Sequence, residues 1–144
     1  MVILSFILTI LVLAYATYKK KSILNSISEI AYIIPSWVFT IWLSFIGILL
    51  MPSLMTILSA NLQWLGFLMI FGLFIVAASP YYRTESKILH YIGGTLSIVC
   101  ATAITAILKP ILLIMWTLFL IPNESWFYYM ELMAFILLII TIIV

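Results

Sequence analysis

Long apolar segments without charge run through most of this chain, and they restrict what it can fold into. Residues 88–106, for example, contain no Asp, Glu, Lys or Arg. The segments are apolar on every face, whereas strands of a membrane β-barrel alternate apolar and polar residues. In hydrocarbon such a segment must satisfy its own backbone N–H and C=O groups, which a helix does. The sequence therefore predicts an all-α, polytopic transmembrane helical bundle, with residues 1–144 as one domain.

The composition supports a membrane environment. The chain is 67% hydrophobic and 7% charged, whereas soluble domains carry about 25% charged residues. Its net charge of +2 is not that of a nucleic-acid-binding protein. The expected partners are the lipid bilayer and other membrane subunits or further copies of the chain.

The number of spans depends on the region around Lys109 and Pro110. A span needs about 20 apolar residues, and we predict six, over residues 2–18, 37–50, 62–78, 88–106, 111–121 and 126–144. Residues 88–121 would make roughly 50 Å of helix, too long for one straight span across a core of about 30 Å. A hairpin at Lys109–Pro110 gives six spans. The alternative is five spans plus a short re-entrant or interfacial helix.

Residues 22–34 do not form a span of their own. Ile23, Ile27, Ile30 and Ile34 recur at helical spacing, and polar residues occupy the other side. This pattern predicts either an interfacial helix or the first turns of the next span. Ser26 and Glu29 are spaced as a capping box.

Orientation follows from the basic residues, because connections rich in Lys and Arg stay in the cytoplasm. Five of the six basic residues follow the first and third spans, and these topology-determining residues are Lys19, Lys20, Lys21, Arg83 and Lys87. We therefore expect a multi-pass protein of the cell membrane with its N-terminus outside and the loops at residues 19–31 and 79–87 in the cytoplasm. Six spans place both termini outside.

Two lines of small residues predict how the spans pack. Membrane helices associate through close contacts at small side chains and through hydroxyl groups. One packing face runs down the fourth span and another down the second; they consist of Gly93, Ser97, Ala101 and Thr105, and of Ser36, Thr40 and Ser44. A pocket lined by these hydroxyls is the alternative interpretation.

His90 and Glu131 are the candidate functional residues, because ionisable side chains inside spans are rare and often functional. Each lies about one turn inside an apolar segment. With six spans they begin at the same side of the membrane and are expected to form a polar pair. With five spans they begin on opposite sides of the membrane, about a bilayer apart, and cannot pair.

The sequence favours a membrane protein without its own catalytic centre. It has one His, one Cys and no Asp, and no spacing typical of a metal site or a nucleophile elbow. We predict no catalytic residue, metal or cofactor. The expected function is an assembly subunit or a binder of a lipid-like ligand. Alternatives are a proton-linked transporter or pore that uses His90 and Glu131, and a small intramembrane hydrolase.

Overall fold

A computed structural model describes residues 1–82, 87–117 and 126–144, and this part of the chain is helical and contains no strand. Five helices are long and apolar enough to cross a membrane. They are α1 (Val2–Lys20), α3 (Ser36–Ile57), α4 (Gln63–Tyr82), α5 (Lys87–Leu108) and α7 (Trp126–Ile143). The shorter elements are η1 (Ile27–Glu29), α2 (Ile30–Ile33), η2 (Ala60–Leu62), η3 (Pro110–Leu113) and α6 (Ile114–Thr117). The predicted all-α bundle is confirmed.

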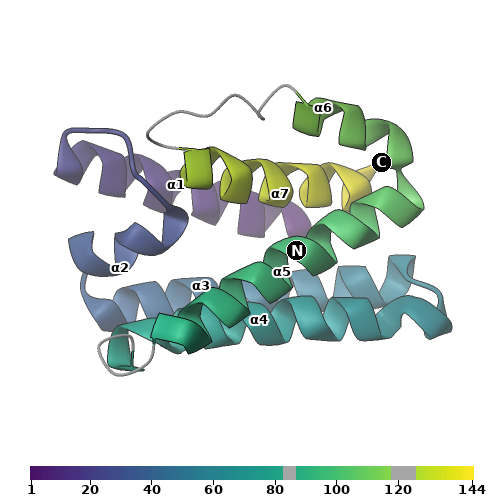
Figure 1. Cartoon of the computed structure of the whole chain (residues 1–144), viewed down its shortest axis with the longest axis horizontal. Helices are drawn as coiled ribbons and strands as arrows, with labels where there is room; N and C mark the ends of the chain where they lie inside the picture. The colour runs from purple at the N-terminus through teal and green to yellow at the C-terminus, as the bar shows by residue number, and fades with distance from the viewer. Residues whose placement is uncertain (83–86, 118–125) are drawn as a thin grey trace.

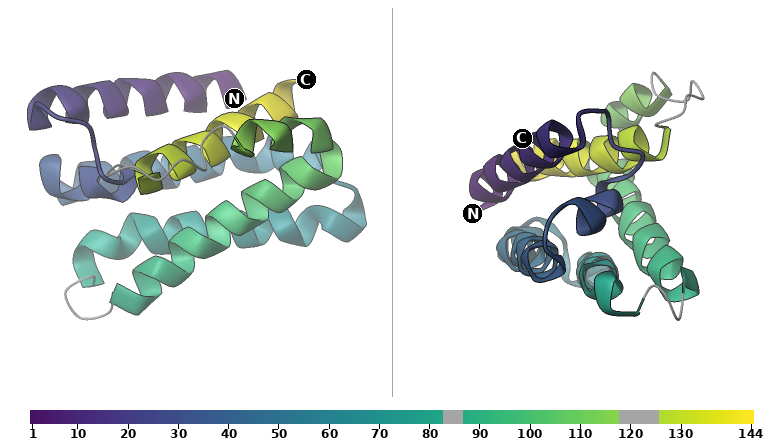
Figure 2. Two further views of the ribbon diagram at one scale, coloured as in Figure 1. Left: turned by 45° about the horizontal axis from the view of Figure 1, so that its top comes forward. Right: turned by 90° about the vertical axis from the view of Figure 1, so that its left-hand side faces the viewer.

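The long helices form a bundle around a shared apolar core (Figure 1). Helices α3 and α4 form an antiparallel hairpin, and α5 packs along α4 and then crosses to α7, as Figure 2 shows. Helix α1 lies against α3 and α7. Both chain termini lie at the same end of the bundle. The most deeply buried side chains include Phe39, Ile46, Leu50, Leu54, Met69 and Ile104.

Small residues allow α4 and α5 to make the most extensive helix contact. A Cβ atom at Gly72 would lie 2.6 Å from the carbonyl oxygen of Gly93 and 2.5 Å from Oγ of Ser97. The Ser97 hydroxyl also donates a hydrogen bond to the carbonyl of Met69, across the helix pair, at 3.1 Å. The absence of side chains at both glycines therefore brings the two backbones together, as is common in membrane helices.

The second and third long helices continue past the predicted span ends at residues 50 and 78, and each passes through a proline. Helix α3 continues through Pro52 to Ile57, and α4 continues through Pro80 to Tyr82. Proline is tolerated inside membrane helices because neighbouring groups satisfy the backbone that it disrupts. The second and third spans are consequently longer than predicted.

The six-span prediction is not met in the described residues. After α5 ends at Leu108, η3 and α6 together cover residues 110–117, roughly 12 Å of helix, which is less than half of a core of about 30 Å. Residues 118–121 of the predicted span lie outside the described residues. The structure thus agrees with the alternative of five long helices plus a short one. The break lies at Lys109, whose φ of −142° and ψ of 65° are not helical. Pro110 favours it, because a proline disfavours the helical conformation in the residue before it.

The six-span prediction also implied that residues 88–106 and 126–144 begin at the same side of the membrane, and the structure agrees on this point. Helices α5 and α7 run in the same direction in both Figure 1 and Figure 2. A hydrogen bond of 3.4 Å joins the hydroxyls of Thr105 and Thr141, which lie late in both helices. The five long helices therefore do not simply alternate in direction.

Residues 22–34 fold back onto the end of the bundle as a separate segment. Leu24 and Ile30 are fully buried, and the segment ends before Pro35. The predicted capping box is not formed, because the carboxylate of Glu29 accepts from the backbone N–H of Asn25 instead of Ser26, at 2.7 Å. The segment closes the end of the bundle at which α1 ends and α3 begins.

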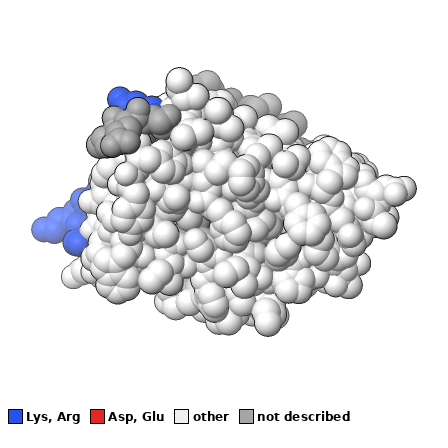
Figure 3. Space-filling model, turned by 90° about the horizontal axis from the view of Figure 1, so that it is seen from below, with Lys and Arg blue, Asp and Glu red and all other residues white. Residues whose placement is uncertain are grey.

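Much of the outer surface is apolar. Large apolar side chains such as Leu11, Ile48 and Phe71 are more than half exposed. On the face drawn in Figure 3, basic side chains lie at one end and the rest of the described surface carries no charge. Soluble monomers rarely expose apolar patches of this extent. This surface is suited to contact with lipid.

Candidate functional site

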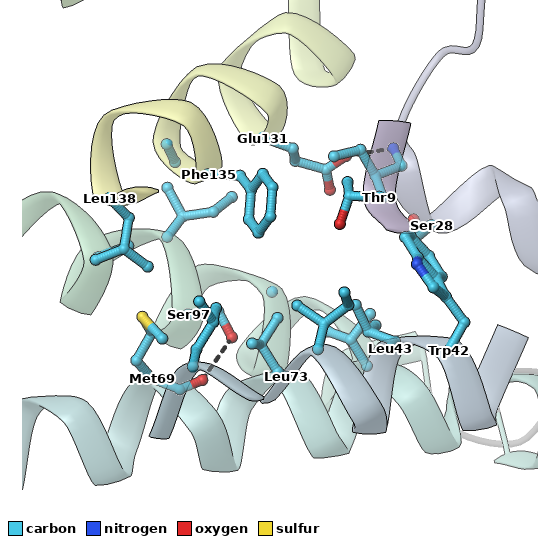
Figure 4. Close-up of a pocket in the computed structure, with 18 of the residues that line it drawn as sticks. Thr9, Ser28, Trp42, Leu43, Met69, Leu73, Ser97, Glu131, Phe135 and Leu138 are labelled. Atoms are coloured by element: carbon cyan, nitrogen blue, oxygen red, sulfur yellow. Dashed lines mark hydrogen bonds between the residues drawn. The ribbon is translucent and has the colours of Figure 1, made fainter. Parts of the chain in front are cut away.

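A cavity of about 110 Å³ lies inside the bundle, between α1, α3, α4, α5, α7 and the η1 turn. It is partly open and is drawn in Figure 4. An apolar cavity of about 150 Å³ holds a benzene molecule, so this space suits a short alkyl segment or a small polar group with its first carbons.

Most of the cavity wall is apolar. Side chains from α3, α4, α5 and α7 surround it, and they include Phe39, Leu43, Met69, Leu73, Ile98, Phe135 and Leu138. Gly94 contributes bare backbone to the wall from α5, and a Cβ there would meet its nearest neighbour, Val76, at 4.0 Å. Apolar walls with a few polar groups are typical of sites for small organic ligands.

Polar groups gather at one end of this cavity, around Glu131. The backbone N–H of Ile27 donates to Oε2 of Glu131 at 2.5 Å, across 104 positions of sequence. Thr9 and Ser28 line the same end of the cavity, as Figure 4 shows. The η1 turn therefore brings a backbone donor to the carboxylate and a hydroxyl side chain to the cavity lining.

Trp42 is the fourth polar residue at this end. It is 7% exposed, and its ring packs against Phe39 with the ring centroids 5.9 Å apart. Its indole nitrogen is buried, and no acceptor among the described residues reaches it. In Figure 4 this nitrogen lies on the edge of the ring that faces the cavity. A buried donor without an acceptor is uncommon and calls for an explanation.

Two lysines next to this end, Lys19 and Lys20, bond to residues 22–34, the segment that closes the bundle there. Lys19 donates to the carbonyl of Ile33 at 2.6 Å, and Lys20 donates to the carbonyl of Ile23 at 2.9 Å. Lys20 also forms an ion pair with Glu29, with its Nζ 2.9 Å from Oε1 and 3.0 Å from Oε2. Burial by itself raises the pKa of Glu29, but the hydrogen bonds and charge of Lys20 and the N–H of Asn25 outweigh it and lower the pKa below 4.5.

His90 lies on the first turn of α5, apart from the cavity lining. It is 7% exposed, and its ring lies edge-on to Tyr91 at a centroid distance of 5.9 Å. The lining of the cavity includes Glu131 but not His90. The predicted contact between these two side chains stays a prediction.

The two predicted packing faces divide between helix contacts and the cavity. On α5, Gly93 meets Gly72, whereas Ser97 and Ala101 line the cavity and Thr105 faces Thr141. On α3, the Thr40 hydroxyl donates to the carbonyl of Ala77 at 2.7 Å, and Ser36 and Ser44 are half-buried. Ser97 does both, because it also bonds to Met69 across the contact between α4 and α5.

The topology-determining residues that the structure describes lie at one end of the bundle. Lys19 and Lys20 end α1, Lys21 follows it, and Lys87 begins α5, at the end opposite Lys109. Arg83 lies outside the described residues. In the part of the chain that the structure describes, no group of three or more His, Cys, Asp or Glu side chains is arranged to hold a metal ion.

Sequence reasoning missed Thr9, Ser28 and Trp42 as cavity residues. Trp42 carried a usable signal, because tryptophan in membrane helices prefers the interfaces, and this one lies inside a predicted span. Thr9 and Ser28 carried none, since single hydroxyl residues are ordinary in apolar helices and loops.

Comparison of the chain with known protein families, with curated proteins and with solved structures found no match.

Proposed function

We propose that this chain is an integral protein of the cell membrane that binds a lipid-like ligand in the cavity at Glu131 and has no catalytic centre of its own. The single observation that carries the proposal is the cavity itself, which has apolar walls and one polar end. A molecule with an alkyl chain and a small polar group matches this division. The apolar outer surface supports placement in the bilayer.

The proposed orientation follows the charges. The end of the bundle with Lys19, Lys20, Lys21 and Lys87 faces the cytoplasm, and the N-terminus faces outside. The polar end of the cavity lies toward this lysine-bearing end, since Glu131 bonds to the turn that closes it. A ligand with its polar group at Glu131 would then lie with its chain toward the middle of the bilayer, as lipids of the inner leaflet do.

Photolabelling tests the proposal. An alkyl probe that carries a diazirine is added to the protein in detergent, irradiated, and mapped by mass spectrometry of peptides. Adducts are expected on cavity residues such as Phe135 and Leu73. Gly94→Leu should strongly reduce these adducts, because its side chain enters open space at the cavity wall.

Val99→Leu is the matched control. Val99 lies on the same helix and is 57% exposed on the outer surface, so enlarging it should leave cavity labelling unchanged. Labelling that is confined to outward-facing residues, and that Gly94→Leu leaves unchanged, would overturn the proposal.

A further inference from the structure

The indole N–H of Trp42 lies at the polar end of the cavity. This nitrogen is a donor only, it is buried, and no acceptor in the described residues reaches it. Inside a protein an unsatisfied donor is costly, because it has lost its hydrogen bond to water. A ligand that accepts a hydrogen bond at this position would remove that cost.

The carboxylate of Glu131 sets the opposite requirement. An ionised carboxylate is an acceptor with about four lone-pair positions. The N–H of Ile27 donates to its Oε2, and the side chain also lines the cavity. In its ionised form this carboxylate would accept a hydrogen bond from a ligand group beside it and would repel a second negative charge.

These two requirements select among the polar groups that lipids carry. An ammonium group donates but cannot accept from Trp42, and a carboxylate or phosphate accepts but is repelled by Glu131. An ester or ketone accepts but cannot donate. A hydroxyl group carries one donor and two acceptor lone pairs, and so meets both requirements with one atom.

We propose that the cavity selects a neutral lipid alcohol, with the ligand hydroxyl accepting from Nε1–H of Trp42 and donating to Glu131. This inference rests on the proposed function and narrows its ligand to a class. A long-chain alcohol and a partial acylglycerol present the same group and are both members of this class. Its alkyl chain lies against Leu73, Phe135 and Leu138.

Competition with ligands of one chain length tests the inference. The diazirine-bearing octanol is the labelling probe, and unlabelled octanol, octanoate, octylamine and octane are the competitors. Octanol should displace the probe at the lowest concentration, with the other three weaker by roughly three- to tenfold or more, the range expected for one or two hydrogen bonds. A monoacylglycerol arm separates acylglycerols from simple alcohols within the same class.

Trp42→Phe removes the donor and keeps an aromatic ring in place. It should lower the affinity for octanol by roughly three- to tenfold and leave the affinity for octane unchanged. Trp37→Phe is the control, since Trp37 lies on the same helix and is 62% exposed. Helical content by circular dichroism verifies that each variant folds.

The outcomes separate the two proposals. If octane competes as well as octanol, or if Trp42→Phe binds octanol as Trp37→Phe does, the alcohol assignment is wrong while a lipid-like ligand remains. If octylamine competes best, Glu131 selects a cation and the assignment is equally wrong. If no probe labels the cavity in any variant, the proposed function itself fails.

Discussion

The contact between α4 and α5 predicts that the same substitution at two adjacent glycines has different effects. At Gly93, an added Cβ would lie 2.7 Å from Cγ2 and 2.8 Å from Cβ of Ile75, and 3.0 Å from the carbonyl oxygen of Gly72. The Cβ of Ile75 moves only with its backbone, so a rotamer change does not relieve the overlap. At Gly94, the nearest atom of Val76 is 4.0 Å away.

The magnitudes follow from the two environments. Gly93→Ala must push α4 and α5 apart, and overpacking of this kind costs about 2 kcal/mol, roughly a thirtyfold change in the ratio of folded to unfolded protein. Gly94→Ala meets no such overlap, and alanine also favours a helix over glycine. We expect its stability to equal or slightly exceed that of the parent protein.

The assay is reversible unfolding in mixed micelles, with increasing denaturing detergent and helical content as the signal. Gly72→Ala belongs to the same contact and should resemble Gly93→Ala, since its Cβ would meet Ser97 and Gly93 within 2.6 Å. The double variant should cost less than the sum of the two single changes, because one separation of the helices relieves both overlaps. Equal stability of Gly93→Ala and Gly94→Ala would refute the reasoning.

Three further predictions concern the lysine-bearing end and the chain direction. The lowered pKa of Glu29 means that its ion pair with Lys20 stabilises the fold fully above about pH 4.5 and loses this effect as the pH falls through the lower folded pKa. Glu29→Gln should weaken the fall of the melting temperature at acid pH. The same fall in the variant and the parent protein would contradict a stabilising ion pair. Lys21 has a φ of 60°, a left-handed conformation that costs most residues about 1 kcal/mol. Lys21→Gly should therefore raise the free energy of unfolding by about that amount, whereas Lys21→Ala should not. Equal effects of the two substitutions would argue against backbone strain at this position. Finally, topology reporters fused at the two termini should give the same side of the membrane, because both termini lie at the same end of the bundle. Reporters on opposite sides would contradict this arrangement.

The apolar segments were sufficient to predict helices and most of their positions. The reason is the solvent, because lipid offers no hydrogen bonds and leaves a continuous apolar segment one way to satisfy its backbone. The same local reasoning ended the second and third spans at residues 50 and 78, whereas the helices continue through Pro52 and Pro80. Whether a proline ends a membrane helix depends on whether neighbouring groups can satisfy the backbone that it disrupts. The sequence of a single segment does not show which groups will lie beside it.

The sequence also identified Glu131 as unusual, since a carboxylate inside an apolar segment is costly wherever it lies. It did not identify the N–H of Ile27 as a partner, because that contact joins residues 104 positions apart and arises only when residues 22–34 fold onto the bundle. The cavity has the same origin. Its wall takes Thr9, Trp42, Gly94 and Glu131 from four different helices, and a space between helices is a property of their packing that no one segment encodes.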